Sequence, residues 1–513
     1  MIFNKKYREF TVNVISLLFI VLFVYAAMSK LLDFETFQIQ LAQAPLLSAY
    51  AGMVSVLVPS IEILLAVLLI IPRFRLAALI GCFGLMVMFT AYIVIILNFS
   101  DFVPCSCGGV LEKLSWTEHL FFNISFIILA VVAILLATRL PRPGKLTTSY
   151  KAVFLALFII AAFATLLLTV LFISSEKKIY RNEAFQRKYL PHAAEYLGDY
   201  ELGSNTYYIA GFKDSIIYLG NLQAPLYLKT LDVSLQHIKD FPVAISNIEL
   251  PYRRARILVE PPFFFLGDGT VPIIFRGNTT DWKADVFSYN EAYFKQFEIA
   301  DSTRIGIAGI SNTTAITNLG LITRATDRDS VIFNDSIITK QVDGIFDSDG
   351  LLLWNTKNKK FLYTYFYRNS YEVTDENLFY KYSGKTIDTV SKAILDIAHH
   401  TKKDQYKRGQ SVMINKYTAT FGDYLFINSD RLGRYEDKAA TETAAIIDVY
   451  NIVTNSYEFS FYLYHQQNKK LNGFRIYKDI LIALVDGRLW IYKLKPEYFD
   501  PGFNTTHTGQ YQE

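Results

Sequence analysis

Charge is scarce in this sequence. Only 19% of its 513 residues are Asp, Glu, Lys or Arg, whereas ordinary soluble domains carry about 25%. Mean hydropathy is correspondingly positive, at +0.23, and we therefore expect a large lipid-embedded part. The net charge of +4 is small, and no segment combines a basic array with interleaved stacking aromatics, so the sequence argues against nucleic-acid binding.

Cysteine is rarer still. The chain has Cys82, Cys105 and Cys107 and none after them. A disulfide formed by the last two cannot be transferred to the long C-terminal part of the same chain, because that part has no cysteine. Any thiol partner must therefore be another molecule. His399 and His400 have no cysteine or spaced carboxylate beside them, and we expect no metal site there.

Five long apolar runs stand out against this scarcity of charge. Each holds about the 20 residues that a helix needs to cross a bilayer, and Glu62 is the only charged residue in any of them. The expected spans are Thr11 to Ser29, Ala49 to Ile71, Leu76 to Ser100, Leu120 to Thr138 and Ala152 to Ser175. The first is too long for the apolar core of a secretory signal and lacks a small-residue cleavage site after it, so we expect it to be retained.

Basic residues predict the orientation, because cytoplasmic loops carry the excess of Lys and Arg. They gather before the first span, between the second and third, and between the fourth and fifth: Lys5, Lys6, Arg8, Arg73, Arg75, Arg139, Arg142, Lys145 and Lys151. We expect a multi-pass protein of the bacterial inner membrane with a cytoplasmic N-terminus. The loop from Asp101 to His119 and everything after Ser175 would then lie in the periplasm, where disulfides persist.

Cys105 and Cys107 lie in that loop. A Cys-x-Cys pair can close only a small strained ring, and strained disulfides tend to be more oxidising than structural ones. The pair is therefore a candidate for redox exchange, with two unpaired thiols as the alternative. Ser115-x-x-Glu118 is a capping box that starts the fourth span, and a helix N-terminus lowers the pKa of a thiol that folds back toward it. His119 is the nearby acid or base, or else an interfacial anchor.

Glu62 also requires an explanation, because a carboxylate inside a span is costly and usually faces a bundle interior or a cavity. One interpretation makes it a proton acceptor or a quinone-contacting group; the other makes it a structural glutamate partnered by Lys30 or Ser29. Cys82 lies near the cytoplasmic end of its span, about 24 Å of helix below the loop at 1.5 Å per residue. We expect Cys82 to be a packing residue.

Three segments of the first 140 residues together resemble a known family. They are Tyr25 to Lys30 running into Asp33 to Phe37, then Pro59 to Glu62, then the Cys-x-Cys loop before a fourth helix. This combination is similar to the MauE type of the DoxX-like membrane proteins. The resemblance implies a four-helix bundle associated with thiol redox, in which MauE proteins support disulfide formation in periplasmic partners beside a thioredoxin-like protein. It extends to Lys30, Glu62, Cys105 and Cys107.

The chain beyond the fifth span changes from a helical period to an alternating one. Short aromatic and β-branched runs recur about every 45 to 60 residues, the length of a four-stranded propeller blade. The runs are Tyr207 to Ala210, Ile216 to Leu219, Arg256 to Leu266, Ile305 to Ala308, Leu351 to Trp354, Phe361 to Tyr367, Tyr424 to Ile427 and Ile480 to Tyr492. Asp-Gly pairs, typical of hairpin turns, occur at Asp268, Asp349 and Asp486. We expect a six-bladed propeller of TolB-like or NHL-like repeat length, with a pair of β-sandwiches as the alternative and a short helix over Val390 to His400.

The expected architecture is thus a multidomain membrane protein, an all-α transmembrane bundle followed by an all-β propeller. Its parts are a four-helix domain (1–140), a cytoplasmic linker (141–151), a fifth helix (152–175), a helical stalk (176–202), the propeller (203–497) and a flexible tail (498–513).

Two functions fit this architecture. The first is thiol–disulfide exchange, with Cys105, Cys107, His119 and Glu62 as the catalytic set. An exported thioredoxin-like or cysteine-containing protein would be docked by the propeller, and a membrane quinone would be the electron partner. The second is a non-enzymatic receptor or assembly factor, in which the helices anchor a propeller that binds a peptide, glycan or protein.

Overall fold

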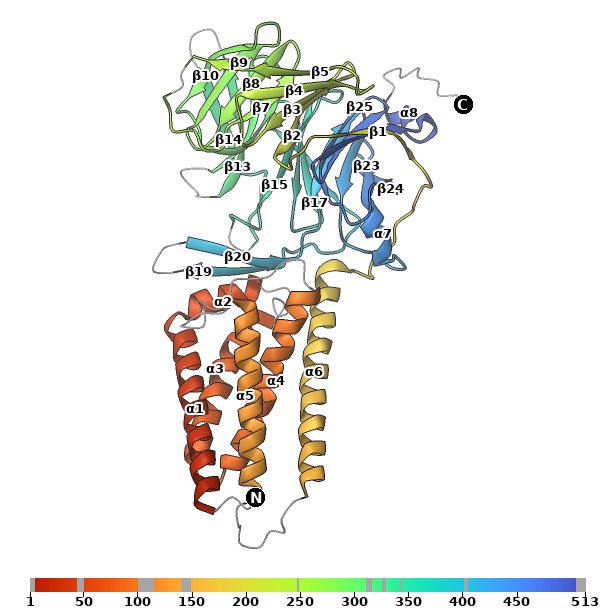
Figure 1. Ribbon diagram of the computed structural model, residues 1–513. Coiled ribbons are helices and arrows are strands. Elements are labelled where there is room, and N and C mark those ends of the chain that lie inside the picture. Colours follow the sequence, from red (N-terminus) through yellow and green to blue (C-terminus); the bar gives the residue numbers. More distant parts are fainter. Residues whose placement is uncertain are drawn as a thin grey trace. The chain divides into compact units, whose positions relative to one another are not determined.

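The computed structural model describes residues 5–43, 50–99, 115–139, 149–246, 249–310, 316–324, 329–341, 344–400 and 405–503. The chain forms two compact units (Figure 1). The helical unit comprises Met1–Ile179 together with Leu395–Ser411, and the propeller unit comprises Tyr180–Ile394 and Val412–Glu513. The chain therefore leaves the propeller once, contributes a segment to the helical unit, and returns.

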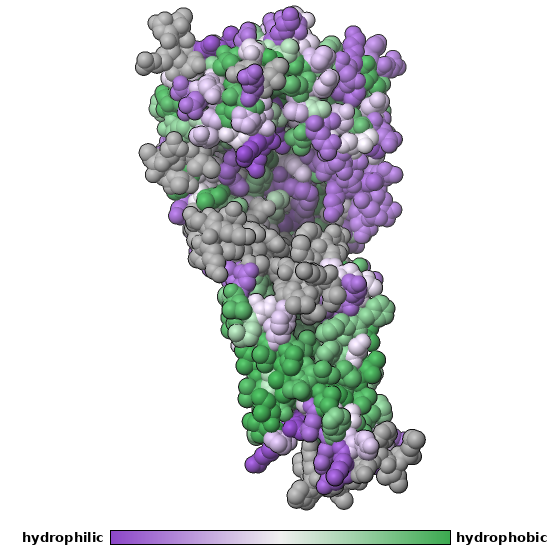
Figure 2. Space-filling model, turned by 60° about the vertical axis from the view of Figure 1, so that its left-hand side comes forward, coloured by the Kyte–Doolittle hydropathy of each residue, from purple (hydrophilic) through white to green (hydrophobic). Residues whose placement is uncertain are grey.

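The helical unit contains α1 (Lys5–Leu32), α2 (Phe34–Gln43), α3 (Ala51–Ile70), α4 (Arg75–Phe99), α5 (Trp116–Ala137) and α6 (Tyr150–Tyr180). All except α2 are long and apolar enough to cross a membrane, which confirms the five expected spans. Most side chains of these spans face outward rather than into the unit, and Figure 2 shows a broad apolar surface over the helices. Outward apolar faces are what lipid solvation requires.

Four of these helices form a closed bundle, because α1 packs against α3 and α5, and α4 packs against the same two helices. The core contains Phe19 and Phe23 of α1 with Leu79 and Cys82 of α4, all fully buried. Cys82 is a packing residue, as expected. The fifth span, α6, joins this core through Val153 and its neighbours.

Helix α2 was not anticipated from the sequence. Its buried residues Phe37 and Leu41 pack with Ile96 of α4 and Leu168 of α6. The hairpin of β19 (Leu395–His400) and β20 (Gln405–Ser411) lies against α2. The expectation of a helix over Val390 to His400 is therefore wrong, since this segment supplies a strand that pairs antiparallel with β20.

The propeller has six blades, each a four-stranded antiparallel sheet or an extension of one. In blade order the strands are β2 (Tyr207–Lys213), β3 (Ile216–Asn221), β4 (Tyr227–Asp232) and β5 (Ile238–Pro242); β7 (Arg256–Glu260), β8 (Phe263–Asp268), β9 (Ile273–Asn278) and β10 (Lys283–Tyr289) with β6 (Ala244–Ile245) at the edge; β11 (Phe294–Ile299), β12 (Arg304–Ile310), β13 (Thr317–Arg324) and β14 (Asp329–Asn334); β15 (Gly350–Asn355), β16 (Lys360–Tyr365), β17 (Ser370–Thr374) and β18 (Tyr380–Lys385); β21 (Tyr417–Phe421), β22 (Tyr424–Asn428), β23 (Ala444–Asn451) and β24 (Ser456–Tyr464); and β25 (Leu471–Tyr477), β26 (Ile480–Val485) and β27 (Arg488–Leu494) with β1 (Ala194–Glu201).

The first strand of each blade contacts the first strand of the next, so that β2, β7, β11, β15, β21 and β25 form a closed ring. The ring is sealed by β1, which pairs with β27 and completes the sixth blade with a strand from the start of the propeller sequence. Every strand run expected from the sequence falls within these blades. A propeller, and not a pair of sandwiches, is the observed fold, and closure removes the exposed sheet edges.

The expected helical stalk over 176–202 is helical only as far as Tyr180. The segment between Tyr180 and β1 packs against the fifth blade. Arg187 is fully buried there, donating to Asp448 at 2.7 and 3.1 Å and to Glu436 at 2.8 Å. A polar stretch predicts a solvated helix only if its charges face water, and here the arginine is an internal anchor instead.

The tail expected to be flexible from 498 begins inside α8 (Pro496–Phe503). Phe499 is fully buried and packs against Tyr424, Phe426 and Phe461 of the fifth blade. A short helix of α7 (Lys438–Thr443) precedes β23, capped by the side chain of Asp437.

Candidate functional site

A cavity of about 430 Å³ lies inside the helical unit, and helices α1 to α6 all line it. Its lining residues come from the C-terminal parts of α1 and α4, as far as Lys30 and Ile93, and from the N-terminal parts of α3 and α5, from Met53 and Trp116. The cavity therefore lies at one end of the bundle, which we call the loop end. The segment that joins α4 to α5 starts and finishes at this end, because it leaves α4 after Phe99 and enters α5 at Trp116.

A buried ion pair forms part of the cavity wall. Lys30 Nζ lies 2.7 Å from Oε1 and 3.0 Å from Oε2 of Glu62. Glu62 has no solvent exposure and the Lys30 side chain is 13% exposed. The ammonium also lies 5.8 Å from the ring centre of Phe37 and 6.0 Å from that of Phe89, close enough for cation–π attraction. Lys30 is thus the partner of Glu62 that one interpretation of the sequence named.

Helix α5 presents three further polar side chains to the cavity, Trp116, His119 and Asn123. Their spacing of three and four residues places them on one helix face. The capping box is confirmed: Ser115 Oγ accepts from Glu118 N at 3.3 Å, and Glu118 Oε2 accepts from Ser115 N at 2.7 Å. This cap fixes the first turn of α5 and so the direction of the face.

His119 stacks on Trp116, with ring centres 6.4 Å apart and planes inclined by 22°. Its Nδ1 atom is buried and has no hydrogen-bond partner among the described residues. Asn123, one turn further along, is 97% buried and also lines the cavity. A buried polar atom without a partner is costly, so the imidazole is suited to a hydrogen bond with something held in the cavity.

The expected catalytic set is therefore located only in part. The structure brings Glu62 and His119 to the wall of one cavity, where Lys30 pairs with Glu62. Cys105 and Cys107 lie outside the described residues. Asn123 was missed, although a lone amide one turn after His119 within an apolar span is a signal that could have found it.

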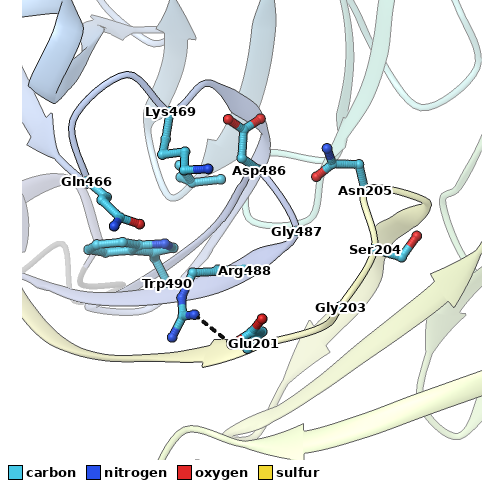
Figure 3. A pocket seen from close by; sticks show the side chains of 11 residues that line it. Glu201, Gly203, Ser204, Asn205, Gln466, Lys469, Asp486, Gly487, Arg488 and Trp490 are labelled. Atoms are coloured by element: carbon cyan, nitrogen blue, oxygen red, sulfur yellow. Dashed lines mark hydrogen bonds and ion pairs between the residues drawn. The ribbon is translucent and has the colours of Figure 1, made fainter.

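The propeller unit has a second hollow, of about 420 Å³, beside the junction of β1 and β27 (Figure 3). Its charged groups already stabilise this junction. Arg488 pairs with Glu201 at 3.0 Å and with Asp199 at 2.5 Å, and Asp486 accepts the backbone N–H of Lys470. We assign no chemistry to this hollow.

The inner ring of the propeller is crossed by an ion pair. Glu298 of β11 and Arg475 of β25, which belong to opposite blades, lie 3.0 Å apart. Burial raises the pKa of Glu298, against the lowering effect of Arg475. Among the described residues, no group of three or more His, Cys, Asp or Glu side chains could hold a metal ion.

Sequence comparison bears on the helical unit. Residues 8–136 match the family model of methylamine utilisation protein MauE. The MauE-like part runs from the first turns of α1 to the end of α5, and it includes the loop with the two cysteines, the ion pair and His119. The expected resemblance is thereby confirmed. No curated protein matches the chain.

Several solved structures are similar to the propeller unit. The β-propeller domain of Cps50 (Swd1) from Myceliophteria thermophila has 7% identity and a TM-score of 0.36, over 59% of this chain and 100% of that one. A member of the duf4221 family from Bacteroides vulgatus has 12% identity and a TM-score of 0.37, over 59% and 98%. YCF48 bound to D1 peptide has 10% identity and a TM-score of 0.33, over 61% and 99%. The propeller assignment rests on the strand order described above.

Proposed function

We propose that this protein carries out thiol–disulfide exchange at the outer face of the bacterial inner membrane, and that its propeller docks the protein with which it exchanges. Cys105 and Cys107 are the exchanging pair. The observation that carries the proposal is the position of the cavity: a buried charge pair and an imidazole lie at the end of a MauE-like bundle where the cysteine loop begins and ends.

The covalent chain keeps the thiols near this end. Cys107 precedes Ser115, the N-cap residue of α5, by eight residues, which limits their separation to at most about 28 Å. The exchange itself follows ordinary thiol chemistry. A thiolate of the partner attacks the loop disulfide, a mixed disulfide forms, and the partner's second thiolate displaces the loop. The partner leaves with a disulfide, and the loop retains two electrons and two protons as a dithiol.

The partner is an exported thioredoxin-like or cysteine-containing protein. It must be a separate molecule, because no cysteine follows Cys107 in the sequence. The propeller is the part of the chain with the area to dock it, since protein interfaces of standard size bury about 800 Å² on each side.

Acid trapping of free thiols in cells, followed by mass spectrometry, tests the exchange. We expect Cys105 and Cys107 to be found both as dithiol and as disulfide, and Cys105→Ser to shift an exported protein toward its thiol form. Cys82→Ser is the matched control and leaves that protein unchanged. A loop locked in one redox state, with no partner affected by Cys105→Ser, would refute the function.

The proposed topology has its own test. A membrane-impermeant maleimide added to reduced intact cells should label Cys107 and spare Cys82, which is fully buried. Labelling of Cys107 only after the cells are permeabilised would place the loop in the cytoplasm and reverse the orientation.

The second candidate is a membrane-anchored propeller receptor or assembly factor without redox turnover. It is favoured by the described part of the propeller, whose buried charges are engaged in structural pairs. The variant that lacks both loop cysteines separates the two functions. If the protein is only a receptor, cells with this variant behave like cells with the wild-type protein. If exchange is the function, the exported partner accumulates in its thiol form in these cells.

A further inference from the structure

We infer that the loop-end cavity binds the head group of an isoprenoid quinone, which accepts the electrons of the Cys105–Cys107 dithiol. This inference rests on the proposed function, and it names the electron acceptor and the residues that hold it. It is carried by three features of the cavity: its access to lipid, the neutrality of its polar end, and the hydrogen-bonding groups that remain there.

The cavity is open to a ligand dissolved in the membrane. Its volume of about 430 Å³ falls within the range of about 300–1,000 Å³ typical of small-molecule sites. Several lining residues are also exposed on the surface of the unit, among them Met53 and Leu57 of α3 and Leu167 of α6. In a membrane this surface faces acyl chains, so an apolar tail can remain in lipid while its head group enters between the helices.

The charge at the polar end selects a neutral head group. The positive charge of Lys30 is balanced by Glu62 at 2.7 Å, and His119 and Asn123 add hydrogen-bonding groups. An anionic phosphate head group would find Lys30, the lysine among the described lining residues, already paired, and desolvating such an anion is costly. A quinone is uncharged in both its oxidised and its reduced form, so it enters and leaves this end without that cost.

The hydrogen-bonding groups match a quinone ring. An ammonium has three donors, and the described contacts of Lys30 to Glu62 use two of them. The remaining N–H can donate to a quinone carbonyl oxygen. Asn123 adds an amide on the α5 face, and the buried Nδ1 of His119 has no partner among the residues described. The rings of Phe37, Phe89 and Trp116 supply flat apolar walls.

The redox step balances without a further reactant. The two S–H groups of the loop lose two electrons and two protons as the S–S bond forms. The quinone takes up the same two electrons and two protons and leaves as the hydroquinone. His119 is placed to pass a proton, because it lies in the first turn of α5, where the cysteine loop ends, and lines the cavity. The loop disulfide is thereby regenerated and can oxidise the next partner molecule.

Trp116 provides a direct binding assay, since quinones quench indole fluorescence on contact and this is the only tryptophan in the helical unit. The full-length protein in lipid nanodiscs, with both loop cysteines changed to serine, is titrated with decylubiquinone and with menaquinone-2. We expect saturable quenching that Trp116→Phe abolishes. The pair of changes His119→Leu and Asn123→Leu should weaken binding at least tenfold. Ser125→Leu, on the exposed side of the same helix, is the matched control and leaves the affinity unchanged.

The opposite results overturn the inference. Non-saturable quenching that is equal in Trp116→Phe would show partition into lipid only. Saturable binding that His119→Leu and Asn123→Leu do not weaken, with an unchanged melting temperature, would place the quinone elsewhere. Retention of a phospholipid in the cavity by native mass spectrometry, with no quinone displacing it, would identify a lipid site instead.

Nanodiscs of the wild-type protein, assayed beside those of the serine variant, distinguish failure of the inference from failure of the proposed function. If quinone binds as expected but does not oxidise the wild-type dithiol, the site stands and the exchange function fails. If the dithiol is oxidised in the membrane while quinone does not bind at Trp116, the exchange function stands and this site fails.

Discussion

Removal of the positive charge at Lys30 should destabilise the helical unit far more than removal of the whole ion pair. Lys30→Met leaves the Glu62 carboxylate fully buried and without its cation. Breaking a buried pair by removing one partner costs about 3–5 kcal/mol, because an uncompensated charge remains. Replacing both partners by apolar residues of similar volume is often neutral or stabilising.

The exposure of each side chain determines how much each substitution should cost. Glu62 has no exposure, so we expect Lys30→Met to cost about 4 kcal/mol. Glu62→Leu should cost less, about 2 kcal/mol, because the Lys30 side chain is 13% exposed near the end of α1 and a long side chain can carry its charge toward the interface. The double variant should lie within about 1 kcal/mol of the wild type. The coupling between the two sites is then about 5–7 kcal/mol, above the range found for most neighbouring pairs.

The reactivity of Cys82 measures the opening of the helical unit alone. It is fully buried in the bundle core, and the propeller contains no cysteine. With both loop cysteines changed to serine, the rate at which a maleimide labels Cys82 under native conditions measures opening of the bundle. A loss of 4 kcal/mol raises that rate about 10³-fold, since each 1.4 kcal/mol is a factor of ten.

Two results would contradict this reasoning. One is labelling of Cys82 in Lys30→Met at the wild-type rate, which would mean that Glu62 is already neutral or solvated. The other is a double variant that opens as readily as Lys30→Met, which would mean that each charge is stabilised mainly by groups other than its partner.

Three predictions concern the propeller. Arg187→Met should cost about 3–5 kcal/mol because it leaves two buried carboxylates without their cation, and it should lower the propeller melting temperature measured by circular dichroism. Arg434→Met, at an exposed arginine, should leave that temperature unchanged. Gly487→Ala should cost about 1–2 kcal/mol in the same assay, because Gly487 has φ +75°, whereas Gly198→Ala should be tolerated. The raised pKa of Glu298 means that the folded state binds the proton of this carboxyl more tightly than the unfolded state does. The stability that this adds is therefore complete below the ordinary Glu pKa of about 4.3 and is lost as the pH rises through the pKa of the folded state. The melting temperature of the propeller should fall over this pH range, and Glu298→Gln should remove that fall.

The membrane spans could be predicted because the bilayer imposes a one-dimensional rule. A run of about 20 apolar residues is sufficient evidence for a spanning helix, whatever packs against it. The blades were predictable for a similar reason, since the repeat length and the alternation of side chains are local properties. Sealing of the ring by β1 was not, because that strand pairs with β27, almost 300 residues further along the chain.

The hairpin of β19 and β20 shows where local patterns fail. Its residues before His400 have no strong strand pattern, and their conformation is set by pairing with the second strand and by contact with α2. The Asp-Gly pairs give the same lesson. Asp486 forms the expected two-residue turn, with positive φ at both of its residues. Asp268 instead accepts the backbone N–H groups of Arg253 and Arg254.

The position of Glu62 brings the structural and the functional interpretations together. A carboxylate that serves only to hold two helices together gains little, because buried ion pairs seldom stabilise more than well-packed apolar residues do, and in lipid the cost of desolvation is higher. The pair with Lys30 removes most of that cost. It also leaves a polar, neutral end in a cavity that apolar residues of similar volume would fill or leave dry. If stability alone were the role of the pair, the double variant would match the wild type in every assay. If the pair also forms part of the proposed quinone site, the double variant will fold normally and yet lose saturable quenching of Trp116.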